Sequence, residues 1–136
     1  EINEEYKERI IKTAEFIDDL HERGTNLSEP PTSEQLSVLF RSNVCWIDRW
    51  YTCAFDAGRR CDYLKELIEK YDLAKGLNQH NSIISISASP KHPLQPQELE
   101  TLQRLLYRSV SEPQFCLKAD DTLGKDLRID FAFYSM

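Results

Sequence analysis

Glycine is scarce in this 136-residue chain, and no stretch of the sequence is apolar for long. The four glycines stand apart at positions 24, 58, 76 and 124, so the sequence has no glycine-rich loop that could cradle a phosphate. No run approaches the roughly 18 apolar residues of a membrane span, and the charged N-terminus does not resemble a signal peptide. We therefore expect no nucleotide-dependent chemistry and no membrane partner.

The sequence also lacks closely spaced metal ligands. None of the cysteines forms a CxxC pair, and no cysteine or histidine lies at zinc-finger spacing from another. The candidate ligands are Cys45, Cys53, Cys61, Cys116, His21, His80 and His92. We expect no metal site and no cofactor, and we interpret the cysteines as reduced thiols of an intracellular protein, cytoplasmic or nuclear.

Catalytic motifs are missing as well. There is no GxSxG sequence, and a Cys–His pair would have to assemble from distant positions such as Cys116 and His92. Asp120, Asp121 and Asp130 with Lys118 would suit a metal-dependent nuclease, but aspartates in a turn, as predicted for Asp120 and Asp121, more commonly bond the local backbone. We predict no catalytic residues, and an enzyme of unrecognised type is the third of our functional hypotheses.

The sequence has too few clustered basic residues to favour nucleic-acid binding. The net charge is −6, and residues 1–24 alone hold eight acidic and four basic side chains. A protein that binds duplex nucleic acid usually has a local basic stripe. The best candidates here, diluted by Asp48 and Asp56, are Arg41, Arg49, Arg59 and Arg60.

What the chain does contain is a long, aromatic-rich stretch, Val44–Tyr71, with no proline and one glycine. Placed on a helix, it has two apolar stripes, one of which includes Trp46 and Trp50. A helix that is apolar over so wide an arc is normally buried on several sides. We therefore predict a long central helix here, without being able to say which of its faces is exposed.

The flanking segments carry clearer local signals. Residues 2–23 have the pattern of an amphipathic helix that ends at Gly24, and Thr32 begins a short helix with a capping box to Gln35. Residues 96–110 predict a further helix. The predicted strands are 82–88, 114–119 and 127–134. The first two strands, joined through a helix, should be parallel, and the last two should form an antiparallel hairpin.

These elements predict an α+β fold in a single domain, 1–136. The first half, 1–76, would be a three-helix unit with the long central helix. The second half, 77–136, would be a βαββ unit with a small mixed three-stranded sheet. The chain begins with Glu1 rather than Met, which is consistent with an excised domain of a larger protein.

The first functional hypothesis is a non-catalytic protein-interaction domain, such as an adaptor, an assembly subunit or an inhibitor, that binds another protein or a second copy of itself. Its contact residues would be Trp46, Arg49, Trp50 and Arg60, because aromatic and arginine side chains anchor many interfaces. The alternative is a nucleic-acid-binding regulator that uses a helix-turn-helix-like segment, 32–60, through Arg41, Arg49, Arg59 and Arg60.

Overall fold

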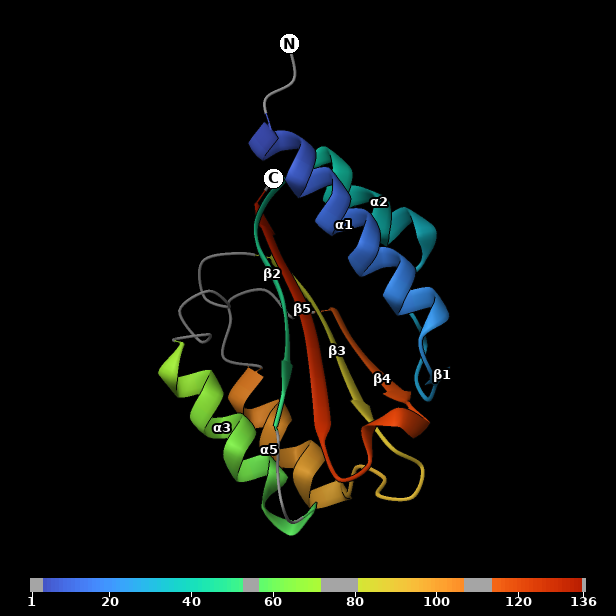
Figure 1. Ribbon diagram of the computed structural model, residues 1–136, viewed down its shortest axis with the longest axis vertical. Coiled ribbons are helices and arrows are strands. Elements are labelled where there is room, and N and C mark those ends of the chain that lie inside the picture. The colour runs from blue at the N-terminus through green and yellow to red at the C-terminus, as the bar shows by residue number, and fades with distance from the viewer. Residues whose placement is uncertain (1–3, 53–56, 72–80, 107–113, 136) are drawn as a thin grey trace.

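A mixed sheet with helices on both faces is the centre of the computed structural model, which describes residues 4–52, 57–71, 81–106 and 114–135 (Figure 1). The described elements are α1 (Glu4–Glu22), β1 (Thr25–Asn26), α2 (Ser33–Arg41), β2 (Asn43–Tyr51), α3 (Arg60–Lys70), β3 (Asn81–Ala88), α5 (Pro96–Leu106), β4 (Gln114–Ala119) and β5 (Leu127–Ser135). Two 3-10 turns, Ala57–Arg59 and Asp121–Leu123, precede α3 and β5. In the described ranges, no helix is long and apolar enough to cross a membrane.

The five strands of the described residues lie in the order β1-β4-β3-β5-β2. The predicted parallel pairing of β3 with β4 is confirmed, and the other three pairings are antiparallel. The predicted hairpin of β4 with β5 is wrong, because β3 lies between them. β5 pairs with β3 over eight residues, whereas β4 has only six residues to offer. Because β3 pairs with β5 as well as with β4, this buried strand has a neighbour on each side.

The predicted long helix over Val44–Tyr71 does not form, because its first part is strand β2 and a later part is the separate helix α3. Trp46 and Trp50 face one side of β2, and Ile47 and Arg49 face the other. A strand covered by helices on both faces carries apolar residues on both, and aromatic residues favour strands. Pairing with β5, about 80 residues away, therefore decides the conformation.

This correction changes the fold of the first half of the chain. The predicted three-helix unit is absent, since residues up to Tyr51 contribute β1 and β2 to the same sheet as the later strands. The sheet accordingly has five strands in the described residues rather than the three predicted. The coarser prediction, a mixed α+β protein, is confirmed.

Local signals were more dependable than the prediction for the central stretch. Gly24 follows the end of α1 with φ +71°, a backbone conformation that residues with a side chain rarely adopt. Thr32 caps α2 by accepting from the Gln35 backbone at 3.1 Å, and the Gln35 side chain accepts from Thr32 N at 2.8 Å. The predicted capping box is thereby confirmed.

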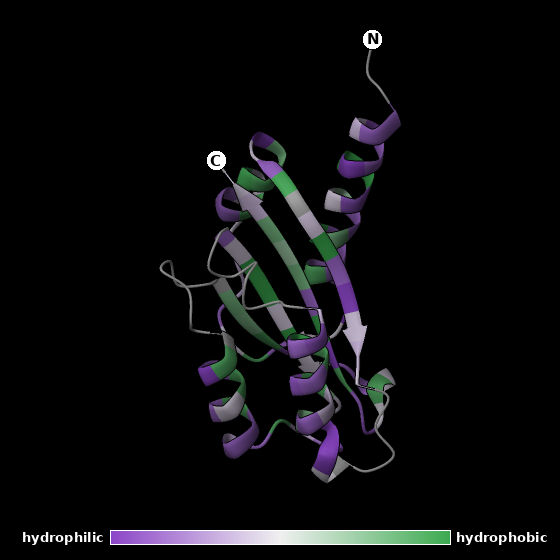
Figure 2. Cartoon of the chain, turned by 90° about the vertical axis from the view of Figure 1, so that its left-hand side faces the viewer, coloured by the Kyte–Doolittle hydropathy of each residue, from purple (hydrophilic) through white to green (hydrophobic). Residues whose placement is uncertain are grey.

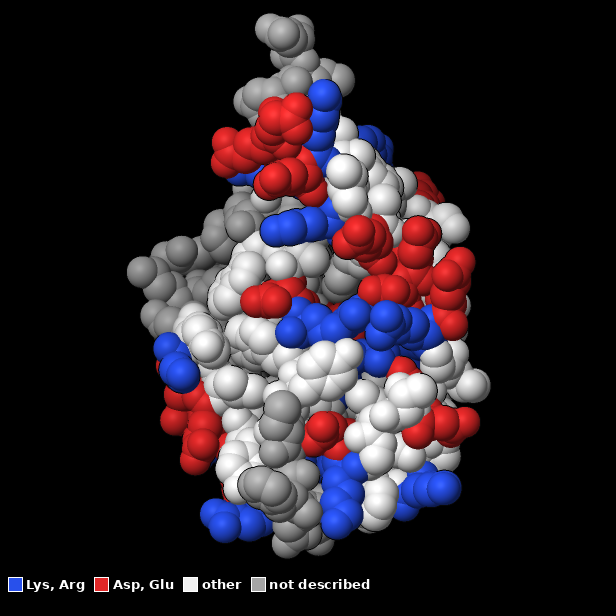
Figure 3. Space-filling view, viewed as in Figure 1, with Lys and Arg blue, Asp and Glu red and all other residues white. Residues whose placement is uncertain are grey.

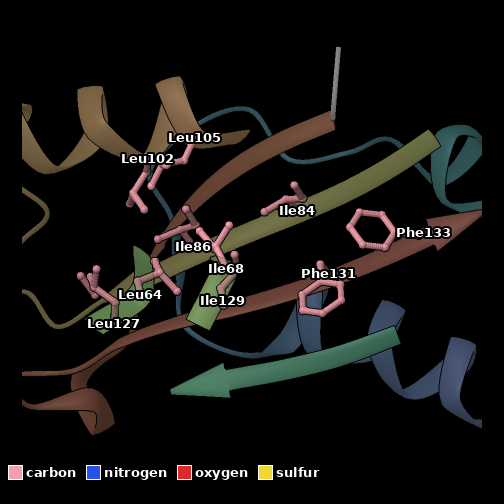
Figure 4. Close-up of a cluster of buried hydrophobic side chains, with 11 residues drawn as sticks. Leu64, Ile68, Ile84, Ile86, Leu102, Leu105, Leu127, Ile129, Phe131 and Phe133 are labelled. Atoms are coloured by element: carbon pink, nitrogen blue, oxygen red, sulfur yellow. The ribbon is translucent and has the colours of Figure 1, made fainter. Parts of the chain in front are cut away.

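The larger apolar core lies between the sheet and the helices α3 and α5 (Figure 4). Leucine and isoleucine side chains of the two helices meet the isoleucine and phenylalanine side chains of β3 and β5. The buried members are Leu64, Ile68, Ile84, Ile86, Ala88, Leu102, Leu105, Leu127, Ile129, Phe131 and Phe133. The opposite face packs α1 and α2 onto a smaller apolar cluster, made of Phe16, Leu20, Leu36, Leu39, Ile83, Cys116 and Ala132.

Candidate interaction surface

Trp46 and Trp50 do not project freely from the molecule. Both side chains are half buried on the α3–α5 side of β2, where they pack edge-on against Phe131 with ring centroids 4.9 and 4.8 Å apart. Trp50 also contacts the ring of Tyr71, which is 49% exposed. The two tryptophans therefore cover the edge of the core and keep part of each ring accessible.

Arg49 lies on the opposite face of β2, so it does not share a surface with the tryptophans. Its guanidinium bonds to Asp130 at 2.5 Å and to Asp19 of α1. Burial alone would lower the pKa of Arg49, but the bonds to Asp130 and Asp19 outweigh it and raise that pKa. Arg49 therefore joins α1 to the sheet through ion pairs with Asp19 and Asp130. Figure 3 shows acidic side chains along α1 beside a band of basic side chains.

Arg60, a predicted contact residue, is 1% exposed, so its side chain offers almost no area to a partner. Its guanidinium forms two hydrogen bonds of 2.8 Å with Glu98 of α5 and donates to the backbone oxygens of His92 and Pro93. Although burial would raise the pKa of Glu98, Arg60 and the backbone amide of Gln95 lower it. Arg60 therefore joins α3 to α5.

The predicted helix-turn-helix over 32–60 does not form, because the helix α2 is followed by the strand β2. Arg41 is exposed at the end of α2, whereas Arg59 is exposed next to α3 on the far side of the sheet. With Arg49 paired to α1 and Arg60 buried, the four arginines make no common basic ridge. No specific observation favours nucleic acid.

The acidic residues considered for nuclease chemistry lie in a buried charge network. Arg128, 2% exposed, bonds to Asp120 at 2.6 Å and Asp130 at 3.0 Å. Burial would raise the pKa of Asp120, but hydrogen bonds from Thr122 and Arg128 lower it to about 2. Asp120 and Asp130 are 7% and 5% exposed and both bond to Arg128, so this buried network holds the end of β4 to β5.

Lys118 of β4 lies on the same face of the sheet and interacts electrostatically with Arg128, Asp120 and Asp130. Burial lowers its pKa, and its ammonium donates to the backbone oxygens of Asp19 and Leu20 in the last turn of α1. A cation is favourable at a helix C-terminus, where the carbonyl groups lack helical partners. Lys118 therefore joins β4 to the last turn of α1.

The two cysteines with described side chains are free thiols. Burial, with help from Glu98 and Asp62, raises the pKa of Cys61 to about 11, and burial also raises that of Cys116. Thiols with raised pKa values are poor nucleophiles. Cys116 lies on the α1–α2 side of the sheet and His92 on the other, so they do not form the pair considered above. The described residues contain no cluster of three or more potential metal ligands, and the predictions for Cys45, Cys53 and His80 lie outside the described side chains.

Among the described strands, β2 is at one edge of the sheet, beside α1 (Figure 2). A hollow of about 260 Å³ separates it from the first half of α1. The β2 side of this hollow is apolar and the α1 side is charged. It is lined by Glu5, Glu8, Arg9, Lys12, Val44, Trp46 and Ile47.

A smaller hollow, of about 90 Å³, continues from Arg9 and Val44 toward the end of α2. Its lining includes Tyr6, Ile10 and Phe40, which are 52%, 40% and 51% exposed. We call the lining of both hollows, together with the outer edge of β2, the α1–β2 surface. Tyr6, Ile10 and Phe40 belong to the apolar faces of their amphipathic helices, and no local signal reveals that these side chains stay exposed.

Comparison of the chain with known protein families and with curated proteins gives no match. Functional inference therefore depends on the geometry of the α1–β2 surface.

Proposed function

We propose that this chain is a non-catalytic protein-interaction domain that binds another protein through the α1–β2 surface. The observation that supports it most is the gathering of Tyr6, Ile10 and Phe40, each at least 40% exposed, around one hollow. Clustered large apolar side chains on a surface usually mark a contact site, because their burial against a partner releases water.

The rim of this surface suits a protein partner. Arg9 and Lys12 border the apolar lining, and Trp46 lies at its edge on β2. Aromatic anchors surrounded by charged residues are typical of protein interfaces. Trp46 thus keeps its predicted role within the proposal, and Trp50 is the next residue on that side of the strand. Arg60 is excluded by its burial.

Site-specific crosslinking tests the proposal directly. A photoreactive phenylalanine analogue at position 40 should give one discrete adduct with another protein in cells that express the chain. Ile10→Glu, which places a charge in the same hollow, should abolish that adduct. Leu27→Glu is the matched control, because Leu27 is 63% exposed and lies outside the surface.

Both variants should keep the circular dichroism of the unaltered protein. An adduct that survives Ile10→Glu, or the absence of any discrete adduct, would refute the α1–β2 surface as the binding site. An adduct of twice the chain mass would identify the partner as a second copy.

A further inference from the structure

We propose that the partner adds a strand to the sheet: an extended segment of another protein pairs with the outer edge of β2 and runs through the hollow beneath α1. This inference rests on the proposed function, since it uses the same surface, and it specifies how the partner is held.

The hydrogen-bond register of β2 identifies the groups available to such a strand. Thr52 N donates to Leu127 O at 3.1 Å, so the amide of Thr52 points toward β5. The pairing of β2 with β5 is regular from Trp46 to Tyr51. Because amides alternate in direction along a strand, those of Ile47, Arg49 and Tyr51 point away from β5, to the outer edge. Such an edge can accept a further strand.

Asp48 keeps this edge from pairing indiscriminately. Its carboxylate accepts from the outward amide of Arg49 at 2.8 Å and from the Trp50 ring nitrogen at 3.2 Å. An incoming strand must replace the first of these bonds with its own carbonyl. The Asp48 carboxylate therefore competes with the carbonyl group of an incoming strand for the amide of Arg49.

The overlying face of α1 restricts which segment fits. The Arg9 guanidinium donates to the Asn43 side-chain oxygen at 3.1 Å, and it forms an ion pair of 3.8 Å with the Glu5 carboxylate. Glu8 and Lys12 also line the hollow, and no described residue forms an ion pair with either. They are one helical turn apart, a rise of about 6 Å. Alternate residues of a strand are separated by about 7 Å, so a basic and an acidic residue two positions apart would match Glu8 and Lys12.

The other face of the added strand would lie beside Trp46 and Trp50, where apolar side chains extend the aromatic cover. The expected segment therefore alternates apolar residues with one basic and one acidic residue. A second copy of β2 fits poorly. Asp48 and Arg49 of β2 are adjacent and therefore project to opposite faces of the strand, so β2 does not offer an acidic and a basic residue two positions apart.

Random peptides displayed on phage, selected against the intact chain, provide the first test. Selected sequences should alternate apolar residues with a basic and an acidic residue in one preferred order. The double exchange Glu8→Lys with Lys12→Glu keeps the net charge and should reverse that order. Sequences without alternation, or an order unchanged by the double exchange, would overturn the inference.

Amide exchange with a selected peptide provides the second test. Protection of the Ile47, Arg49 and Tyr51 amides should rise at least tenfold. Tyr51→Pro, which removes an outward amide, should weaken peptide binding at least tenfold relative to Tyr51→Val. Asp48→Ala should strengthen it several-fold, whereas Asp48→Asn keeps an acceptor oxygen and should change it little.

The outcomes also separate this inference from the proposed function. If crosslinking from position 40 depends on Ile10 but the three edge amides stay unprotected, the interaction surface stands and strand addition is wrong. If the chain dimerises in sedimentation experiments with those amides protected, the occupant is a second copy, which also overturns the inference. If Tyr51→Pro unfolds the chain, the other two measurements test strand addition. These are the protection of the three edge amides and the difference in peptide affinity between Asp48→Ala and Asp48→Asn.

Discussion

The two faces of the sheet are built from the same strands, but one face is apolar and the other carries many polar and charged side chains. Toward α3 and α5, strands β3 and β5 present Ile84, Ile86, Phe131 and Phe133, all at most 1% exposed. Toward α1 and α2, the alternate positions include a row of serines and charged groups, with a smaller apolar cluster beside them. That row comprises Ser85, Ser87, Lys118, Arg128 and Asp130.

The difference indicates a division of labour between the faces. Apolar burial on the α3–α5 face supplies free energy without strict geometry. Buried ion pairs contribute less net stability because both partners lose their hydration, yet they tolerate only one arrangement of the groups. Through Arg49 and Lys118 the charged face fixes where α1 lies. The position of the α1–β2 surface thus depends on the electrostatically specified side of the sheet.

The largest effect should come from breaking the charged face at its centre. Arg128→Met leaves Asp120 and Asp130 buried without the guanidinium that joins them, and we expect a loss of about 3–5 kcal/mol in the free energy of unfolding. Urea denaturation measures it. Arg104→Met, which removes an exposed pair with Glu100, is the control and should cost less than about 0.5 kcal/mol. A loss below about 1 kcal/mol for Arg128→Met would show that the network contributes little.

On the apolar face, Ile86→Ala should cost about 2–5 kcal/mol, because it opens a cavity beside the packed side chains of α3 and α5. The conservative change Ile86→Val should cost only about 0.5–1.5 kcal/mol. The same denaturation measurement applies to both. Equal losses from the two variants would contradict a cavity as the cause.

The charged face should also make stability depend on acid. The pKa of Asp120 lies at about 2 in the folded protein, below the ordinary value of 3.8. Its contribution is therefore complete above about pH 4 and is lost as pH falls toward 2, a decrease on the order of 2 kcal/mol. Unfolding free energies at pH 6, 4 and 2 should show a shallower decline for Asp120→Asn. Asp121→Asn, at the exposed neighbouring position, should follow the unaltered protein.

The smallest effect is expected at the boundary between the charged face and solvent. Arg49→Met removes bonds to Asp19 and Asp130, but the Arg49 side chain is 27% exposed and Asp130 keeps Arg128. We expect a loss of about 1 kcal/mol. Amide exchange should become faster in the second half of α1 and remain unchanged in α5. Faster exchange in both helices would mean that Arg49 stabilises the whole fold rather than only the packing of α1 on the sheet.

How far the sequence predicted this molecule depended on the range of the interactions. Helices α1, α2 and α5 and strands β3, β4 and β5 were predicted within a few residues, since capping residues and hydrophobic periodicity act locally. Of the predicted contact residues, Trp46 is the one that lines a hollow of the candidate surface. Tyr6, Ile10 and Phe40 carried no sign of exposure, because their exposure depends on where α1 and α2 extend past the sheet.

The sequence by itself determined the chemistry of the two faces, because side chains alternate along a strand: Ile84 and Ile86 against Ser85 and Ser87 in β3, with the same division in β5. Only the tertiary structure decided that residues 43–51 form a strand and that β5 lies beside β3. An aromatic segment that is apolar on both sides suits a buried helix and a doubly covered strand equally well. The choice was made by backbone hydrogen bonds to β5, a partner about 80 residues away that no local pattern can reveal.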